Sequence, residues 1–157
     1  MKKTNLLWIL LLLLVMLLGC QQVSEINKEN EAENPKAPYP YEEAIKNGDI
    51  VNFHGEISNL HKFDSFLKNV KSGTKDLIQI TIYTIEGAPI FYNLSYDGNK
   101  IIYTYDNTLD GFAGSDKGIK STSCSNIESQ DIENGVGYYL SECTSEVGNT
   151  FYFSVLE

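Results

Sequence analysis

The chain has 157 residues, 21 acidic side chains and 12 lysines, which leave a formal net charge of −9. Recognition of nucleic-acid phosphates depends on clustered lysine and arginine side chains. Since the chain is acidic and contains no arginine, we expect no nucleic-acid partner. The simplest role of the acidity is to keep the protein soluble.

The first 19 residues predict an export signal. Lys2 and Lys3 precede an unbroken apolar run over residues 6–18. As a helix this run would be about 20 Å long, whereas the apolar core of a bilayer is about 30 Å thick. A positive start before a short apolar run is typical of a secretory signal peptide. The alternative is an uncleaved membrane anchor in which the following cysteine is incidental.

The apolar run ends in Leu17, Leu18, Gly19 and Cys20, which resembles the lipobox of bacterial lipoproteins. The resemblance implies that residues 1–19 are a lipoprotein signal peptide and that Cys20 carries a diacylglyceryl group with palmitate-type acyl chains. Two acyl chains give stable membrane anchoring, which one chain does not. We therefore expect attachment to the membrane through lipid on Cys20, at the extracytoplasmic face of the cell membrane.

Residues 20–40 predict a lipidated N-terminus followed by a disordered tether, because they contain few apolar side chains and end in prolines. Such a link would hold the folded part away from the lipid surface. Residues 41–157 are expected to form a single domain.

Two helices are expected in this domain. The first begins at residue 41 with acidic side chains and ends at Asn47-Gly48. The second covers residues 60–71 and ends at Gly73. Its apolar side chains recur at helical spacing on one face: Leu60, Phe63, Phe66, Leu67 and Val70.

The apolar period changes to two after residue 77, which predicts strands. Asp97-Gly98 is a strong hairpin signal between two of them. Short turns join the strands without a strand–helix–strand rhythm, so the sheet should be antiparallel. We expect an α+β fold with one antiparallel sheet of about five to seven strands, one main helix packed on a face, and a short N-terminal helix. The expected strands are residues 50–54, 77–85, 89–96, 100–106, 119–124, 136–143 and 150–156.

Cys124 and Cys143 remain once Cys20 is lipidated, and an even remainder in an exported chain suggests a disulfide. The loop that it would close is about 20 residues long, for which the chain-entropy relation gives about 3 kcal/mol. A redox pair is a weaker alternative because the spacing is not C-x-x-C. A further alternative is that both thiols are reduced or are paired with another molecule.

No catalytic or metal-binding constellation is expected. Residues 106–117 begin like an EF-hand calcium loop, but the twelfth position is Lys117 instead of an acid. His54 and His61 are the only histidines and lack the further ligands that a zinc site needs. No G-x-S-x-G nucleophile motif occurs. We therefore expect no metal, no cofactor and no enzymatic activity.

Tyr92, Tyr96, Tyr103 and Tyr105 fall on adjacent hairpin strands and form the candidate binding surface. If they share an exposed face, they form an aromatic platform of the kind found at recognition surfaces. The alternative is that these side chains cover the core or brace the sheet by cross-strand pairing. The loop over residues 107–118 would be a second binding element.

Residues 44–73 and 80–108 resemble small lipoproteins of low-GC Gram-positive bacteria of the Bacillus type, whose domain is catalogued as one of unknown function. The resemblance implies a secreted, anchored α+β domain and supplies no active site. We expect a cell-envelope lipoprotein that acts as a non-catalytic protein- or peptide-binding module. The alternatives are a small-ligand or cell-wall-binding module and, more remotely, a cell-envelope hydrolase.

Overall fold

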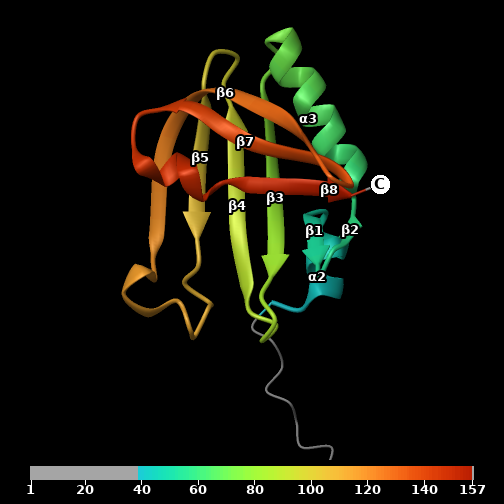
Figure 1. The fold of residues 1–157 in the computed structure, drawn as a ribbon, viewed down its shortest axis with the longest axis vertical. Coiled ribbons are helices and arrows are strands. Elements are labelled where there is room, and N and C mark those ends of the chain that lie inside the picture. Colours follow the sequence, from blue (N-terminus) through green and yellow to red (C-terminus); the bar gives the residue numbers. More distant parts are fainter. Residues whose placement is uncertain (1–38, 157) are drawn as a thin grey trace, which may run out of the picture. The chain divides into compact units, whose positions relative to one another are not determined.

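The computed structural model describes residues 39–156, and every structural statement below concerns that part of the chain. The expected signal peptide, Cys20 and nearly all of the expected tether lie outside the described residues. Figure 1 shows the arrangement of the elements. They are α2 (Tyr41–Asn47), β1 (Ile50–Phe53), β2 (Glu56–Ser58), α3 (Leu60–Ser72), β3 (Asp76–Tyr83), β4 (Pro89–Tyr96), β5 (Ile101–Asp106), β6 (Ile119–Ile132), β7 (Gly135–Cys143) and β8 (Tyr152–Leu156), with short 3-10 turns η1 (Gly114–Asp116) and η2 (Glu146–Thr150).

The two expected helices are confirmed as α2 and α3, and both end where a glycine was expected to end them. Gly48 and Gly73 follow the two helices in the left-handed conformation, with φ of 94° and 72°. Backbone carbonyls of the last helical turn accept hydrogen bonds from each of these glycines. A residue without a side chain adopts this conformation at little cost, which is why glycine ends both helices.

The expected α+β fold with an antiparallel sheet of five to seven strands is wrong. The described part is mostly β, with eight strands in one mixed sheet of order β2-β1-β3-β4-β5-β6-β7-β8. β1 and β3 pair in parallel, and every other neighbouring pair is antiparallel. Parallel neighbours need a long crossover between them. The β2 hairpin arm and α3 together supply that crossover, so α3 connects the sheet as well as covering it.

A tight turn at His54 and Gly55 creates the strand that the sequence analysis missed. Both residues have positive φ, 54° and 99°, so the chain reverses immediately after β1. Phe53 then pairs with Glu56 across the turn. Two residues at positive φ are the backbone of a type I′ hairpin, whose twist matches that of the strands.

β6 is the strand that bends the sheet. Its first half pairs with β5 as far as Cys124, and from Cys124 onward it pairs with β7. As a result β7 and β8 cross in front of β3, β4 and β5, and the sheet curves until it nearly closes on itself (Figure 1). The main core lies inside this curve, on what we call the inner face of the sheet.

α3 covers the open side of the curved sheet with two fully buried phenylalanines, Phe63 and Phe66. The Phe63 ring lies 4.9 Å from that of Tyr138 on β7 and 4.8 Å from that of Phe153 on β8. Helix and strands far apart in sequence therefore share one core. The other buried members of this core are Ile50, Ile78, Ile80, Leu94, Tyr96, Ile101, Tyr103, Cys124, Leu140 and Phe151.

The predicted cysteine pair lies at disulfide bonding distance. Cys124 and Cys143 are direct partners across β6 and β7, and their Sγ atoms are 2.09 Å apart. Cys124 is completely buried. The pair therefore joins the two strands where β6 leaves β5 for β7.

A smaller apolar cluster attaches α2 to the outer face of β1 and β3. Ala44 packs there against Val51 and Tyr83. The Tyr41 ring stacks on the Phe53 ring at 4.4 Å. α2 therefore has a fixed position on the sheet, and so does the segment that follows it.

Candidate functional site

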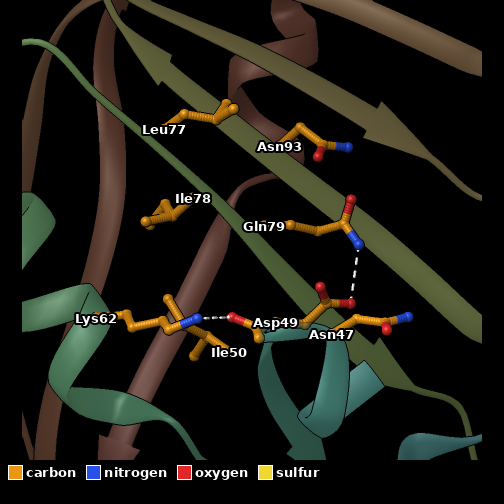
Figure 2. Close-up of a pocket in the computed structure, with 9 residues that line it drawn as sticks. Asn47, Asp49, Ile50, Lys62, Leu77, Ile78, Gln79 and Asn93 are labelled. Atoms are coloured by element: carbon orange, nitrogen blue, oxygen red, sulfur yellow. Dashed lines mark hydrogen bonds between the residues drawn. The ribbon is translucent and has the colours of Figure 1, made fainter. Parts of the chain in front are cut away.

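A cavity of about 270 Å³ opens on the outer face of the sheet, where the α2–β1 connection meets α3, β3 and β4 (Figure 2). Its walls carry both charged and carboxamide side chains above an aliphatic floor. The lining residues are Asn47, Gly48, Asp49, Ile50, Lys62, Leu77, Ile78, Gln79 and Asn93.

Asp49 is the central acid of this cavity and is only 7 % exposed. Its Oδ2 accepts three hydrogen bonds, from the Thr81 hydroxyl at 2.7 Å, the Gln79 amide at 2.8 Å and the Tyr39 hydroxyl at 3.0 Å. The hydrogen bonds to the Asp49 side chain from residues 39–156 all go to Oδ2, and because no buried side-chain oxygen there lacks a partner, Oδ1 is open to the solvent of the cavity (Figure 2). One oxygen of the carboxylate is therefore saturated and the other is free.

The backbone around Asp49 is held from two sides. Its N–H donates to Ala44 O at 3.0 Å, which continues the left-handed turn at Gly48. The Asn59 side chain donates to Asp49 O at 2.8 Å and to Ile45 O at 3.1 Å. Asn59, the residue before α3, makes no side-chain cap bond to that helix and instead fixes this connection.

Lys62 brings a positive charge to the same cavity. Its Nζ donates a hydrogen bond to Gly48 O, and a Cβ at Gly48 would collide with that nitrogen. The one ion pair within residues 39–156 joins Lys120 to Asp116, so Lys62 and Asp49 do not pair with each other. An ammonium has three donors, and two of those on Lys62 remain for a ligand.

Two carboxamides from neighbouring strands complete the polar wall. Gln79 on β3 and Asn93 on β4 are direct cross-strand partners. The Gln79 amide nitrogen is engaged by Asp49, whereas the Asn93 side chain has no hydrogen bond to a described residue. The cavity thus offers a free carboxylate oxygen, a free ammonium and a free carboxamide, which suits a compact polar molecule.

The four candidate tyrosines share one face, but it is the inner face. Tyr103 is completely buried and Tyr96 is 8 % exposed, while Tyr92 and Tyr105 are half-buried. Burial, followed by the neighbouring phenol of Tyr105, raises the pKa of Tyr92 to about 12. The Tyr92 ring lies 5.8 Å from both Tyr103 and Tyr105. These rings brace the core by cross-strand contact, and a binding role for them stays a prediction.

The acidic loop after β5 uses its side chains to build turns. Asp106 Oδ1 accepts from the N–H and the hydroxyl of Thr108, and Asp110 Oδ1 accepts from the Phe112 N–H. Asn107 Oδ1 accepts from the Gly118 N–H at 2.8 Å. Within residues 39–156 no group of three or more His, Cys, Asp or Glu side chains is placed to hold a metal ion.

The two histidines stand apart from the cavity. His54 lies in the β1–β2 turn, where its Nε2 is 3.1 Å from Thr84 O, and His61 is exposed on α3. As for the membrane, no helix in the described part of the chain is long and apolar enough to span a bilayer.

One protein-family model matches residues 47–139, which is more than half of the chain, and it describes a domain of unknown function, DUF4362. The matched segment contains every residue that lines the cavity. Neither a curated protein nor a solved structure matches the chain. The resemblance to a domain of unknown function is thus confirmed, while Cys20 lies outside both the matched and the described residues.

Proposed function

The chain belongs to the DUF4362 family, and from that premise we propose that it is a lipid-anchored, extracytoplasmic binding module. Its binding site in this proposal is the Asp49 cavity. Its ligand is a small zwitterion of the amino-acid type, with one ammonium and one carboxylate group.

The free Oδ1 of Asp49 is the observation that carries the ligand class. Taking a carboxylate out of water is costly unless a partner compensates the charge. Neutral donors already satisfy Oδ2, and no described cation lies at Oδ1. Water reaches Oδ1, because no buried side-chain oxygen of residues 39–156 lacks a partner, and a ligand ammonium would replace this water and compensate the charge.

Lys62 supplies the opposite half of the recognition. Its ammonium faces the same cavity without a carboxylate partner among the described residues. A ligand carboxylate at Lys62 and a ligand ammonium at Asp49 would leave the two carboxamides to contact the substituent. The volume of about 270 Å³ lies just below the usual range for ligand pockets, about 300–1,000 Å³, and so favours a compact molecule.

The ligand proposal is tested by calorimetric titration of the mature chain, residues 20–157 with Cys20→Ser, with glycine, alanine, glutamate and lysine. N-acetylalanine and alanine amide, which each lack one charge, serve as matched probes. Lys62→Gln should weaken binding about tenfold or more, because a hydrogen bond to a charged group is worth about 1.5–3 kcal/mol. Lys68→Gln, on an exposed position of the same helix, should leave the affinity unchanged.

Two results would contradict the ligand class. One is the absence of heat with all four amino acids. The other is equal affinity for alanine and for its two singly charged derivatives, since neither charged group would then be recognised. Either result would leave the lipid anchor untouched.

The lipid anchor is supported by the short apolar run that ends in Gly19 and Cys20. Cells that express the whole sequence and are fed radiolabelled palmitate should carry the label on this protein in the membrane fraction. Cys20→Ser should abolish the label, because the thiol is the acceptor. Labelling that survives this substitution would refute the proposed anchor.

Peptide binding is the second candidate, and the edge position of β8 favours it. β8 ends the strand order and pairs only with β7 among the described strands. An unpaired edge can accept an extended peptide as an added strand. Slower amide exchange in β8 on addition of a cell-surface protein retained by the mature chain would support this second mode.

A further inference from the structure

Two large apolar side chains stand almost fully in solvent at one end of the sheet. Ile85 is 90 % exposed in the turn between β3 and β4, and Phe112 is 80 % exposed in the connection between β5 and β6. Ile119, at the start of β6, is 65 % exposed. Figure 1 places both connections at the lower end of the strands.

The described chain begins at this same end. The Tyr39 ring lies 5.4 Å from that of Phe91, near the start of β4. Tyr39 O accepts a hydrogen bond at 2.7 Å from the hydroxyl of Tyr83, the last residue of β3. The segment that leads back to Cys20 therefore leaves the domain beside the two apolar tips.

We propose that this end of the domain rests on the membrane, with the Ile85 and Phe112 side chains inserted into the lipid interface. The proposal rests on the proposed lipid anchor at Cys20. Residues 21–38 lie between that cysteine and Tyr39 and reach at most about 65 Å when fully extended. Tethering to the same surface raises the effective concentration, so contacts too weak to recruit a free protein suffice.

The turns that carry Ile85 and Phe112 are closed by their own polar groups. Thr84 accepts from the Ala88 N–H at 3.1 Å, which closes the turn that carries Ile85. Asp110 accepts from the Phe112 N–H at 2.8 Å and is itself only 9 % exposed. The apolar side chains therefore project beyond the polar groups that build the loops.

Charge favours a lipid interface of low net charge. Asp116 is paired with Lys120 at 3.6 Å, and Asp110 is turned into its loop. Glu86 stays exposed beside Ile85. An anionic headgroup layer would repel that carboxylate, so zwitterionic phosphatidylcholine is the probe surface.

A single-tryptophan experiment tests the contact. Trp8 is the only tryptophan of the chain and lies in the expected signal peptide, so Trp8→Phe removes background from any uncleaved chain and Phe112→Trp adds one indole to the domain. The full chain is purified from membranes and reconstituted in phosphatidylcholine vesicles with and without brominated acyl chains. The matched control is Ile102→Trp, near the start of β5 and at the opposite end of the sheet, where Ile102 is 42 % exposed.

The indole of the Phe112→Trp chain should emit at shorter wavelength on vesicles than in water and should be quenched by brominated lipid. The Ile102→Trp chain should show neither change. Equal emission and equal quenching of the two variants would overturn the membrane contact.

Mass spectrometry of the same preparation reads the anchor separately. Lipid mass on Cys20 without quenching of the Phe112→Trp indole refutes the contact alone. Quenching of the Phe112→Trp indole in a chain that carries no lipid on Cys20 would refute the lipid anchor but would still support the membrane contact.

Discussion

The Thr81 hydroxyl donates to Asp49 Oδ2 at 2.7 Å, and this bond joins the α2–β1 connection to the middle of β3. Thr81 is completely buried and Asp49 nearly so. Water cannot replace either partner without entering the packed layer under α2. The same carboxylate that stabilises the fold therefore presents its other oxygen to the cavity.

Thr81→Val should lower the free energy of unfolding by about 1.5–3 kcal/mol, since it removes a buried donor to a charged acceptor without changing the side-chain shape. Asp49→Ala should cost more, because three donors lose their acceptor at once. The loss of unfolding free energy in the double variant should be smaller than the sum of the two single-variant losses, since Thr81→Val removes a donor that Asp49→Ala would leave unpaired. Urea unfolding of the three variants measures this coupling, and strict additivity would contradict it.

Reduction of the Cys124–Cys143 pair should lower the free energy of unfolding by about 3 kcal/mol. The partners are 19 residues apart in sequence, so the loop released in the unfolded chain is short. Urea unfolding with and without reductant measures the loss. Native protein should also resist thiol alkylation until it is reduced, and rapid alkylation of the untreated protein would argue against the bond.

Gly148→Ala should destabilise the domain by about 1–3 kcal/mol, the usual cost of overpacking. A Cβ at Gly148 would collide with the Cys143 side chain. Gly111→Ala is the matched control, because a Cβ there has nothing within 4 Å. In a Cys124→Ala/Cys143→Ala background the Gly148→Ala penalty should shrink without vanishing, since the Sγ contact is gone while the Cβ at position 143 remains. A penalty that persists unchanged would place its cause elsewhere.

Local signals made α2, α3 and the β3–β5 meander predictable. Gly48 and Gly73 end the two helices in the left-handed conformation. Because glycine is the residue that adopts this conformation most readily, its position in the sequence predicts the helix ends. The Asp97-Gly98 turn and the alternating apolar residues set the meander in register, with Leu94 opposite Tyr103. These features depend on neighbours in sequence.

The parallel β1–β3 pair and the long β6 were missed because distant contacts decide them. β1 is short, and nothing local indicates that Ile50 will lie beside Ile80. The second half of β6 is largely exposed and polar, and it becomes a strand only because β7 pairs with it. The apolar pattern in that half is too weak to predict a strand.

The tyrosine pattern put four rings on adjacent strands but could not tell whether the face that they share is exposed or covered. The alternation of residues along a strand shows which side chains lie on the same face of the sheet. The packing of β7 and β8 decides which face is buried. The cavity was missed for a similar reason. Asp49 follows the end of a helix, where an acid is ordinarily solvated. It is buried because it contacts Gln79 and Thr81, which lie 30 and 32 residues away in sequence and which no local pattern connects to it.

Alkaline conditions should unfold the domain partly through Tyr92. Burial raises its pKa to about 12, against an ordinary value of 10.0, because the folded state disfavours the charged phenolate. The unfolded chain therefore loses this proton first, and the stability that the neutral phenol contributes is complete below pH 10 and declines as pH rises towards about 12. Burial also raises the pKa of Tyr103, which adds to the slope.

Tyr92→Phe should flatten the fall in unfolding free energy over this window, measured by urea titrations at stepped pH. Tyr152→Phe, whose ring is 49 % exposed, is the control, and an equal slope in both variants would mean that Tyr92 titrates as freely in the folded state as in the unfolded one.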